Sequence, residues 1–312
     1  MINRRLLYLI TMLLPVAVYA FSFGKPLVKS QLRIAKPLVM QNVHDRVISN
    51  LDITGKTVDC IKLSNCRNIT IKSCRLRYSV KNGVSVLNCS NVTIVDCYFE
   101  KVATGVYALS SKAVLVNHNQ FKNMCGPFPR GQFVQFDSVS GPDNQINYNT
   151  CENLPGQSHP EDAINLYKTY GTEGSPVQVT GNRIRGGGPS KTGGGIMLGD
   201  YGGGYILATN NILVNPGQYG MAIAGGNNIS MINNTIYGRR QPFTNVGIYI
   251  WNQHAAGCSL NTISGNKIRW TSAKGENNPG WNQGNCSKTS GWSTNIFNAK
   301  IKETILPQKL ID

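Results

Sequence analysis

Val177-Gln-Val-Thr-Gly-Asn182-Arg-Ile184 is the stretch that decides the fold, because its pattern recurs along most of this 312-residue chain. The pattern is apolar-x-apolar-x-x-(Asn or Cys)-x-apolar. Copies begin 22 to 32 residues apart, a spacing typical of repeat proteins. The copies cover residues 69–76, 92–99, 114–121, 146–151, 177–184, 206–213, 229–236 and 261–268.

A repeat of this kind predicts stacked coils of short parallel strands. One turn of such strands cannot bury its apolar residues alone. The next turn, about 4.8 Å away, completes a continuous core and pairs the backbone. Asn recurs at one place in the pattern, where its amide can bond to the Asn of the next coil. Asn also tolerates the left-handed backbone of a sharp corner. The expected corner file is Asn119, Asn182, Asn211, Asn234 and Asn266.

The two ends of the chain depart from the repeat. Arg4 and Arg5 precede an apolar run from Leu6 to Val18, and the small residue Ala20 follows. Residues 1–20 are therefore predicted to be a signal peptide cleaved after Ala20, with an uncleaved anchor as the alternative. We expect residues 21–57 to form an N-terminal cap and first partial coil, 58–270 the coils, and 271–312 a C-terminal capping tail. No later stretch is apolar enough to span a bilayer, which predicts a secreted or periplasmic protein without stable membrane insertion.

The composition indicates the kind of partner. Lys and Arg number 31 against 15 Asp and Glu, a formal net charge of +16 that suits an acidic polymer, although solubility alone also explains it. The basic residues are scattered, and no recognition-helix or zinc-finger pattern appears, which argues against nucleic acid. We expect a monomer that binds a polysaccharide, an acidic one on the evidence of the charge.

Nine cysteines suggest how the coils are joined. The pairs Cys66 and Cys89, and Cys74 and Cys97, are each 23 residues apart, so each pair is either a disulfide between coils or two stacked thiols. Both alternatives stay open. A disulfide between Cys258 and Cys286 is predicted near the tail. No cysteine pair has the spacing of a zinc site.

Three apolar runs with polar residues at matching places mark the candidate site: 133–137, 163–168 and 195–200. Set in register, their files are Gln135, Asn165 and Met197; Asp137, Tyr167 and Gly199; and Ser138, Lys168 and Asp200. Strict alternation would send Asp137 and Lys168 to opposite faces, so we expect a bend that brings them together. Insertions at 122–130, 152–160 and 185–194 fall at one corner and predict walls beside this face.

The repeat, the Asn corner and the Gly-(Val or Ile)-x-(Val or Ile) strands resemble right-handed parallel β-helix proteins of the pectate-lyase-like superfamily. The resemblance covers roughly residues 47–270 and implies an all-β, single-domain right-handed parallel β-helix. Residues 160–166 look like the Asp-Asp strand of polygalacturonase-type hydrolases, and 193–199 look like their Gly-His-Gly strand. Asp162 matches the second Asp of the pair. Glu161 stands for the first, Gln132 for an earlier Asp, and Gly194 for the His.

The same resemblance implies uronate lyases, which remove the proton beside a substrate carboxylate. Their Lys or Arg base works with cationic groups or Ca2+. On this hypothesis Lys168 is the base and Arg130 or Arg185 neutralises the substrate. Asp137, Asp162 and Asp200 orient the site or bind Ca2+. The alternative for Lys168 is a salt bridge that stabilises the face.

Further residues are expected to contact substrate or move protons. His159 on a wall is a candidate acid or base near neutral pH, or an ordinary exposed histidine. The candidate substrate-binding residues are Gln132, Gln135, Glu161, Asn165, Tyr167, Arg130 and Tyr201. The first hypothesis is thus a lyase or epimerase of a uronate glycan. The second is a non-catalytic glycan-binding or adhesive β-helix, and the third is a polygalacturonase-like hydrolase.

Overall fold

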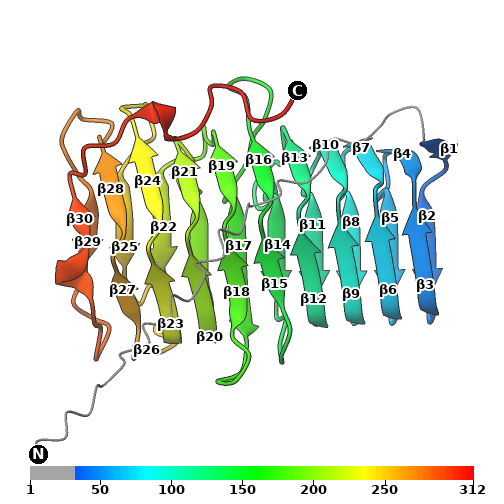
Figure 1. Cartoon of the computed structure of the whole chain (residues 1–312), viewed down its shortest axis with the longest axis horizontal. Helices are drawn as coiled ribbons and strands as arrows, with labels where there is room; N and C mark the ends of the chain where they lie inside the picture. The colour runs from blue at the N-terminus through cyan, green and yellow to red at the C-terminus, as the bar shows by residue number, and fades with distance from the viewer. Residues whose placement is uncertain (1–31) are drawn as a thin grey trace, which may run out of the picture.

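The computed structural model describes residues 32–312, so the predicted signal segment lies outside the described residues. Its strands wind into a right-handed parallel β-helix whose three-strand coils stack along one axis (Figure 1). Residues 32–57 already form strands, so this part of the predicted cap is the beginning of the coil stack. Within residues 32–312 no helix is long and apolar enough to cross a lipid bilayer.

Three ribbons of parallel strands form the sides of the solenoid. The first ribbon contains β2 (Leu38–Gln41), β5 (Ile61–Ser64), β8 (Val84–Leu87), β11 (Val106–Leu109), β14 (Val134–Asp137), β17 (Ile164–Tyr170), the start of β20 (Ile196–Thr209), β22 (Tyr219–Ile223), β25 (Val246–Ile250) and β29 (Gly280–Asn282). The second ribbon contains β3 (His44–Ser49), β6 (Arg67–Lys72), β9 (Ser90–Val95), β12 (Lys112–Asn117), β15 (Gln145–Asn147), β18 (Val177–Thr180), the end of β20, β23 (Gly226–Ile232), β26 (Cys258–Ser259) and β27 (Thr262–Ser264). The third ribbon contains β1 (Arg33–Ala35), β4 (Leu51–Lys56), β7 (Arg75–Ser79), β10 (Tyr98–Val102), β13 (Gln120–Lys122), β16 (Thr150–Glu152), β19 (Arg183–Arg185), β21 (Ile212–Val214), β24 (Thr235–Gly238), β28 (Lys267–Trp270) and β30 (Ile296–Phe297).

The core consists of side chains that stack from coil to coil. In the first ribbon one inward file is fully buried from β5 to β25: Ile61, Val84, Val106, Val134, Ile164, Ile196, Met221 and Ile248. Each such side chain contributes roughly 1.5 to 3 kcal/mol of burial free energy. The outward residues of the same strands differ in exposure: Val39 and Trp281 are exposed, whereas Met197 and Ala222 are buried.

The predicted Asn ladder is confirmed at the corner between the second and third ribbons. Asn182 accepts from the backbone N–H of Asn149 at 3.0 Å, and its own N–H donates to Asn211 at 3.0 Å. Asn149 is a further member of the ladder, although the copy at residues 146–151 predicts Cys151 at this place. Cys151 instead pairs with Phe121 in the third ribbon. The residue with a left-handed backbone at each corner is not the ladder residue but the one before it, for example Asn210 before Asn211.

Cysteines take the ladder position in the first coils. The backbone N–H of Cys74 donates to Sγ of Cys97 at 3.5 Å, and the N–H of Cys97 donates to Oδ1 of Asn119 at 3.0 Å. These cysteines and the Cys66 and Cys89 pair are free thiols, so the stacked-thiol alternative holds. The predicted disulfide between Cys258 and Cys286 is present.

The C-terminal tail departs from the expected cap. After η2 (Trp292–Thr294) and β30, the chain runs back along the third ribbon through η3 (Glu303–Ile305), as the red trace in Figure 1 shows. Buried Glu152 accepts from the N–H of Leu310 at 2.8 Å and of Ile311 at 3.3 Å. The final segment therefore covers the side of the solenoid and not only its end.

Candidate functional site

The candidate site lies on the outward face of the first ribbon. Asn165 stands in register with Gln135 on one side and with Met197 on the other, as predicted. The next file differs from prediction, because a register shift between β17 and β20 pairs Asp200 with Tyr167. The expected file of Ser138, Lys168 and Asp200 is therefore wrong by one residue, and Lys168 takes a left-handed backbone at the bulge.

Asp162 is the most deeply placed acid of this face. It lies just before β17 and is buried. Its carboxylate accepts from the N–H of Gly194 at 3.0 Å, from Nδ2 of Asn165 at 2.8 Å, and from the hydroxyl of Tyr219. Burial raises the pKa of Asp162 to about 7, while the three hydrogen bonds act in the opposite direction. This carboxyl group can therefore give or take a proton near neutral pH.

Asn165 joins Asp162 to the second acid of the site, Asp200. The same Nδ2 that binds Asp162 donates to Oδ2 of Asp200 at 3.0 Å. One nitrogen atom, Nδ2 of Asn165, thus donates to a carboxylate oxygen of each aspartate. Oδ1 of Asn165 is buried and has no hydrogen-bond partner among the described residues. A buried acceptor of this kind favours a ligand that supplies a hydroxyl donor.

Gly194 leaves the space through which Tyr219 reaches Asp162. Tyr219 begins β22, and a Cβ atom added at Gly194 would lie 2.7 Å from Cδ1 of its ring. Sequence reasoning missed Tyr219, because it lies 57 residues from Asp162. The available signal was Gly194 itself, which stands where the hydrolase pattern has a histidine.

Asp200 is covered by residues from a later coil. Nε2 of His254 lies 3.6 Å from Oδ1 of Asp200, and the imidazole stacks on Tyr201 at 3.7 Å between ring centroids. His254 belongs to the loop after β25, and sequence reasoning missed it for this reason. The ring centroids of Tyr167 and Tyr201 are 5.2 Å apart. Tyr167 pairs with Asp200 across the strands and Tyr201 follows Asp200 in sequence, so both predicted tyrosines lie beside Asp200.

Lys168 lies at the exposed edge of this cluster. Its Nζ is 5.2 Å from the Tyr167 ring centroid and 5.9 Å from that of Tyr201. Among the ion pairs of residues 32–312, none involves Lys168. The salt-bridge alternative therefore does not hold, and Lys168 does not bridge Asp137 and Asp200.

Arg130 and Asp137 form a second group, one coil toward the N-terminus. Arg130 donates to Oε1 of Gln135 at 2.7 Å and lies 4.2 Å above the Tyr107 ring. The Tyr107 hydroxyl donates to Asp137 at 2.9 Å, and Ser138 donates to it at 3.0 Å. The contacts thus place Arg130 beside the outward residues Gln135 and Tyr107.

The other predicted residues support the walls. Glu161 is buried and accepts from Ser190 at 2.7 Å and from Thr192 at 2.6 Å. Gln132 is also buried, and it donates to the carbonyl of Pro129 at 2.9 Å. His159 is exposed on its wall.

Arg185 does not reach the site. It lies in the third ribbon and donates to the Leu306 carbonyl at 2.8 Å and to Glu303 at 3.1 Å. The prediction that Arg185 extends from a wall is therefore wrong, because the tail takes up its guanidinium.

A sequence model described as the right handed beta helix region matches residues 38–186 and 162–279. The chain belongs to the right-handed β-helix family. No curated protein sequence matches this β-helix chain.

Several solved structures share the fold. The catalytic domain of a GH87 alpha-1,3-glucanase in complex with nigerose has a TM-score of 0.58 at 14% identity, over 82% of this chain and 50% of that one. An alginate lyase from Paenibacillus sp. str. FPU-7 has a TM-score of 0.48 at 12% identity, over 79% and 92%. PfbA, a surface adhesin of Streptococcus pneumoniae, has a TM-score of 0.47 at 13% identity, over 77% and 65%. This β-helix thus spans half the glucanase domain, and at such identities the likeness shows the fold alone.

The predicted calcium ligands do not fit a metal ion in this β-helix. Asp162 and Asp200 meet through Asn165, whereas Asp137 is held by Tyr107 and Ser138. Among residues 32–312, no group of three or more Asp, Glu, His or Cys side chains is arranged to hold a metal. Calcium prefers six or more oxygen ligands, which these separated carboxylates do not supply.

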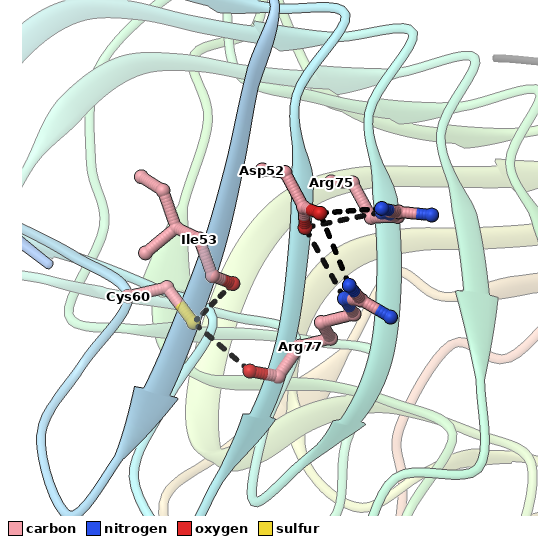
Figure 2. Close-up of polar contacts among 5 residues, drawn as sticks. All are labelled: Asp52, Ile53, Cys60, Arg75 and Arg77. Atoms are coloured by element: carbon pink, nitrogen blue, oxygen red, sulfur yellow. Dashed lines mark hydrogen bonds and ion pairs between the residues drawn. The ribbon is translucent and has the colours of Figure 1, made fainter. Parts of the chain in front are cut away.

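A separate polar cluster lies at the N-terminal end of the third ribbon. Asp52 accepts from Arg75 Nε at 3.1 Å and from Arg77 Nε at 3.1 Å and Nη2 at 3.0 Å, as Figure 2 shows. Burial opposes the charge of Asp52, but these bonds hold its pKa below the usual value. Cys60 donates to the carbonyls of Ile53 and Arg77 beside it (Figure 2). The cluster ties neighbouring coils together, and we assign it a structural role.

Proposed function

We propose that this protein binds a polysaccharide along the outward face of the first ribbon and hydrolyses its glycosidic bonds. One observation carries the proposal: Asp162, whose pKa burial raises to about 7, shares the amide of Asn165 with Asp200. Glycoside hydrolysis needs one carboxyl group that is protonated near neutral pH and a second that is ionised. Asp162 suits the first role and the more solvent-accessible Asp200 the second.

The residues divide the reaction as follows. Asp162 gives its proton to the glycosidic oxygen as the bond to the anomeric carbon breaks. Asp200 takes a proton from the water whose oxygen bonds to that carbon. The free Oδ1 of Asn165 accepts a hydroxyl of the sugar. One water molecule is consumed, each sugar fragment ends in a hydroxyl group, and the proton that Asp200 gains returns through solvent to Asp162.

An acidic glycan is the substrate class that we propose. Arg130 is fixed by Gln135 and Tyr107, and no carboxylate of residues 32–312 forms an ion pair with it. Its guanidinium remains available for a substrate carboxylate. The net charge of +16 favours the same class.

A uronate lyase or epimerase is the second candidate, and the same Arg130 favours it. This reaction uses Lys168 as base, and Lys168 is exposed on the same face. The geometry supports hydrolysis better, because Arg185 lies under the tail and the carboxyl pair has a proton-transfer role of its own. A non-catalytic adhesin would use the same face for binding alone.

A comparison of products separates these functions. Polygalacturonate, alginate and α-1,3-glucan are incubated with the wild type, and both reducing ends and the absorbance of unsaturated products are followed. Hydrolysis gives reducing ends without absorbance, and Asp162→Asn lowers the rate about 100-fold or more while Lys168→Ala leaves it nearly unchanged. Unsaturated products that depend on Lys168 establish the lyase. Binding without any product establishes the adhesin.

We also propose that the protein is exported. The disulfide between Cys258 and Cys286 supports an oxidising compartment. Cell fractionation and N-terminal sequencing of the exported chain test this, and a protein that stays in the cytoplasm contradicts it.

A further inference from the structure

Two exposed tryptophans end the outward face of the first ribbon. Trp281 lies on β29 and Trp251 directly follows β25. Their side chains are 40% and 37% exposed, and their ring centroids are 5.6 Å apart at an interplanar angle of 63°. Indole is a large apolar surface, so two neighbouring exposed indoles indicate a surface kept for a ligand.

The tryptophans are connected to the carboxyl pair through a row of aromatic contacts. Tyr219 binds Asp162, and its ring meets Tyr249 edge-on at 5.3 Å. Tyr249 in turn lies 6.2 Å from Trp281. Along this row Tyr219 is fully buried and Tyr249 nearly so, whereas Trp281 is open to solvent. The row of aromatic side chains therefore begins in the interior at Tyr219 and ends at the surface at Trp281.

The register sets the distance between the two places. Asn165, Met197, Ala222, Tyr249 and Trp281 occupy one outward file in successive coils. Four steps of about 4.8 Å place Trp281 about 19 Å from Asn165 along the axis. A disaccharide held at the carboxyl pair does not reach that far. Met197, Ala222 and Tyr249 between the two places are buried, so a longer chain that joins them lies over the residues that cover this file.

We propose that Trp251 and Trp281 form a distal subsite that stacks on sugar rings of a glycan chain lying along the solenoid axis. The inference rests on the proposed function for its ligand class, since it requires a glycan at the carboxyl pair. The flat indole faces contact the CH faces of the sugars, and the subsite selects long chains over short ones. It supplies binding free energy but takes no part in proton transfer.

Binding of a chain-length series tests the subsite. Trp281→Ala and Trp251→Ala are compared with the wild type by calorimetry and tryptophan fluorescence. The probes are di- to octasaccharides of polygalacturonate, alginate and α-1,3-glucan. Tyr78→Ala is the matched control, because Tyr78 is 43% exposed on the third ribbon. We expect the long oligosaccharides to bind each Trp variant about 10-fold or more weakly, with short ones and the Tyr78 variant unchanged.

The outcomes separate the subsite from the proposed function. Equal affinity of the wild type and both Trp variants for long chains overturns the subsite, even where Asp162-dependent cleavage is found. Long-chain binding that is lost in Trp281→Ala supports the subsite, even where no product forms and the hydrolase proposal fails. Absence of binding to every probe overturns the subsite.

Discussion

The hydroxyl of Tyr219 donates a hydrogen bond to Oδ1 of Asp162 across two coils of the solenoid. Gly194, in the coil between them, makes this contact sterically possible and adds its own backbone N–H to the same oxygen. The buried acid is thereby held in one orientation, with its second oxygen turned to Asn165. Four predictions follow from this arrangement and from the tail.

Asp162→Asn changes how stability depends on pH. Burial raises the pKa of Asp162 from 3.8 to about 7, so between these values the folded protein holds a proton that the unfolded chain releases. Folding stability contributed by this group therefore falls as pH rises through that window. The wild type loses this stability as the pH rises and Asp162→Asn does not. The free energy of unfolding of the variant minus that of the wild type therefore increases by roughly 2 to 4 kcal/mol from about pH 4 to about pH 8.

Urea unfolding at the two pH values measures this gain. Asp143→Asn serves as control, because Asp143 is exposed. A wild-type to Asp162→Asn difference that stays constant with pH contradicts a buried, proton-holding Asp162.

Tyr219→Phe raises the pKa of Asp162 above that of the wild type. The hydrogen bond from Tyr219 stabilises the charged carboxylate and lowers this pKa against the effect of burial. The protonated acid then persists to higher pH, which moves the basic limb of any pH–rate profile upward. Carbon NMR of the aspartate carboxyl groups reports the change without a substrate. Tyr237→Phe, on β24 of the third ribbon, should leave the titration as it is.

Gly194→Ala displaces Tyr219. The added Cβ meets the Tyr219 ring and its backbone carbonyl at 2.7 Å, so the chain must shift to admit it. Overpacking of this kind costs roughly 1 to 3 kcal/mol. Thermal unfolding measures the cost, with Gly174→Ala as control, because nothing lies within 4 Å of a Cβ at Gly174. Equal stability of the two variants would show that Tyr219 does not occupy this space.

Arg185→Ala loosens the C-terminal tail from the third ribbon. Arg185 binds the carbonyls of Glu303 and Leu306 and the side chain of Glu303, so its loss leaves the buried carbonyl of Leu306 unpaired. We expect a loss of roughly 1 to 3 kcal/mol. Limited proteolysis should cut residues 299–312 sooner than in Lys309→Ala, whose side chain is exposed. An unchanged rate of proteolysis would show that Arg185 does not keep the tail bound to the third ribbon.

Sequence reasoning placed Asp137, Lys168 and Asp200 on neighbouring strands but set two of these strands in the wrong register. The alternation of β14 and β17 sets Gln135 beside Asn165, as predicted. The bulge between β17 and β20 moves Asp200 by one place. Between β14 and β17, Asp137 pairs with Tyr167 and not with Lys168, and no ion pair of residues 32–312 joins Lys168 to an acid, so the predicted meeting of acid and lysine does not occur.

By itself the sequence determined the stack of coils, the Asn corner and the disulfide between Cys258 and Cys286. These depend on a repeated spacing that each coil carries in its own residues. Only the tertiary structure decided that Tyr219 contacts Asp162, that His254 contacts Asp200, and that Arg185 binds the C-terminal tail. The physical reason is that these contacts join residues through loops of unequal length, whose paths depend on how they pack and not on the repeat.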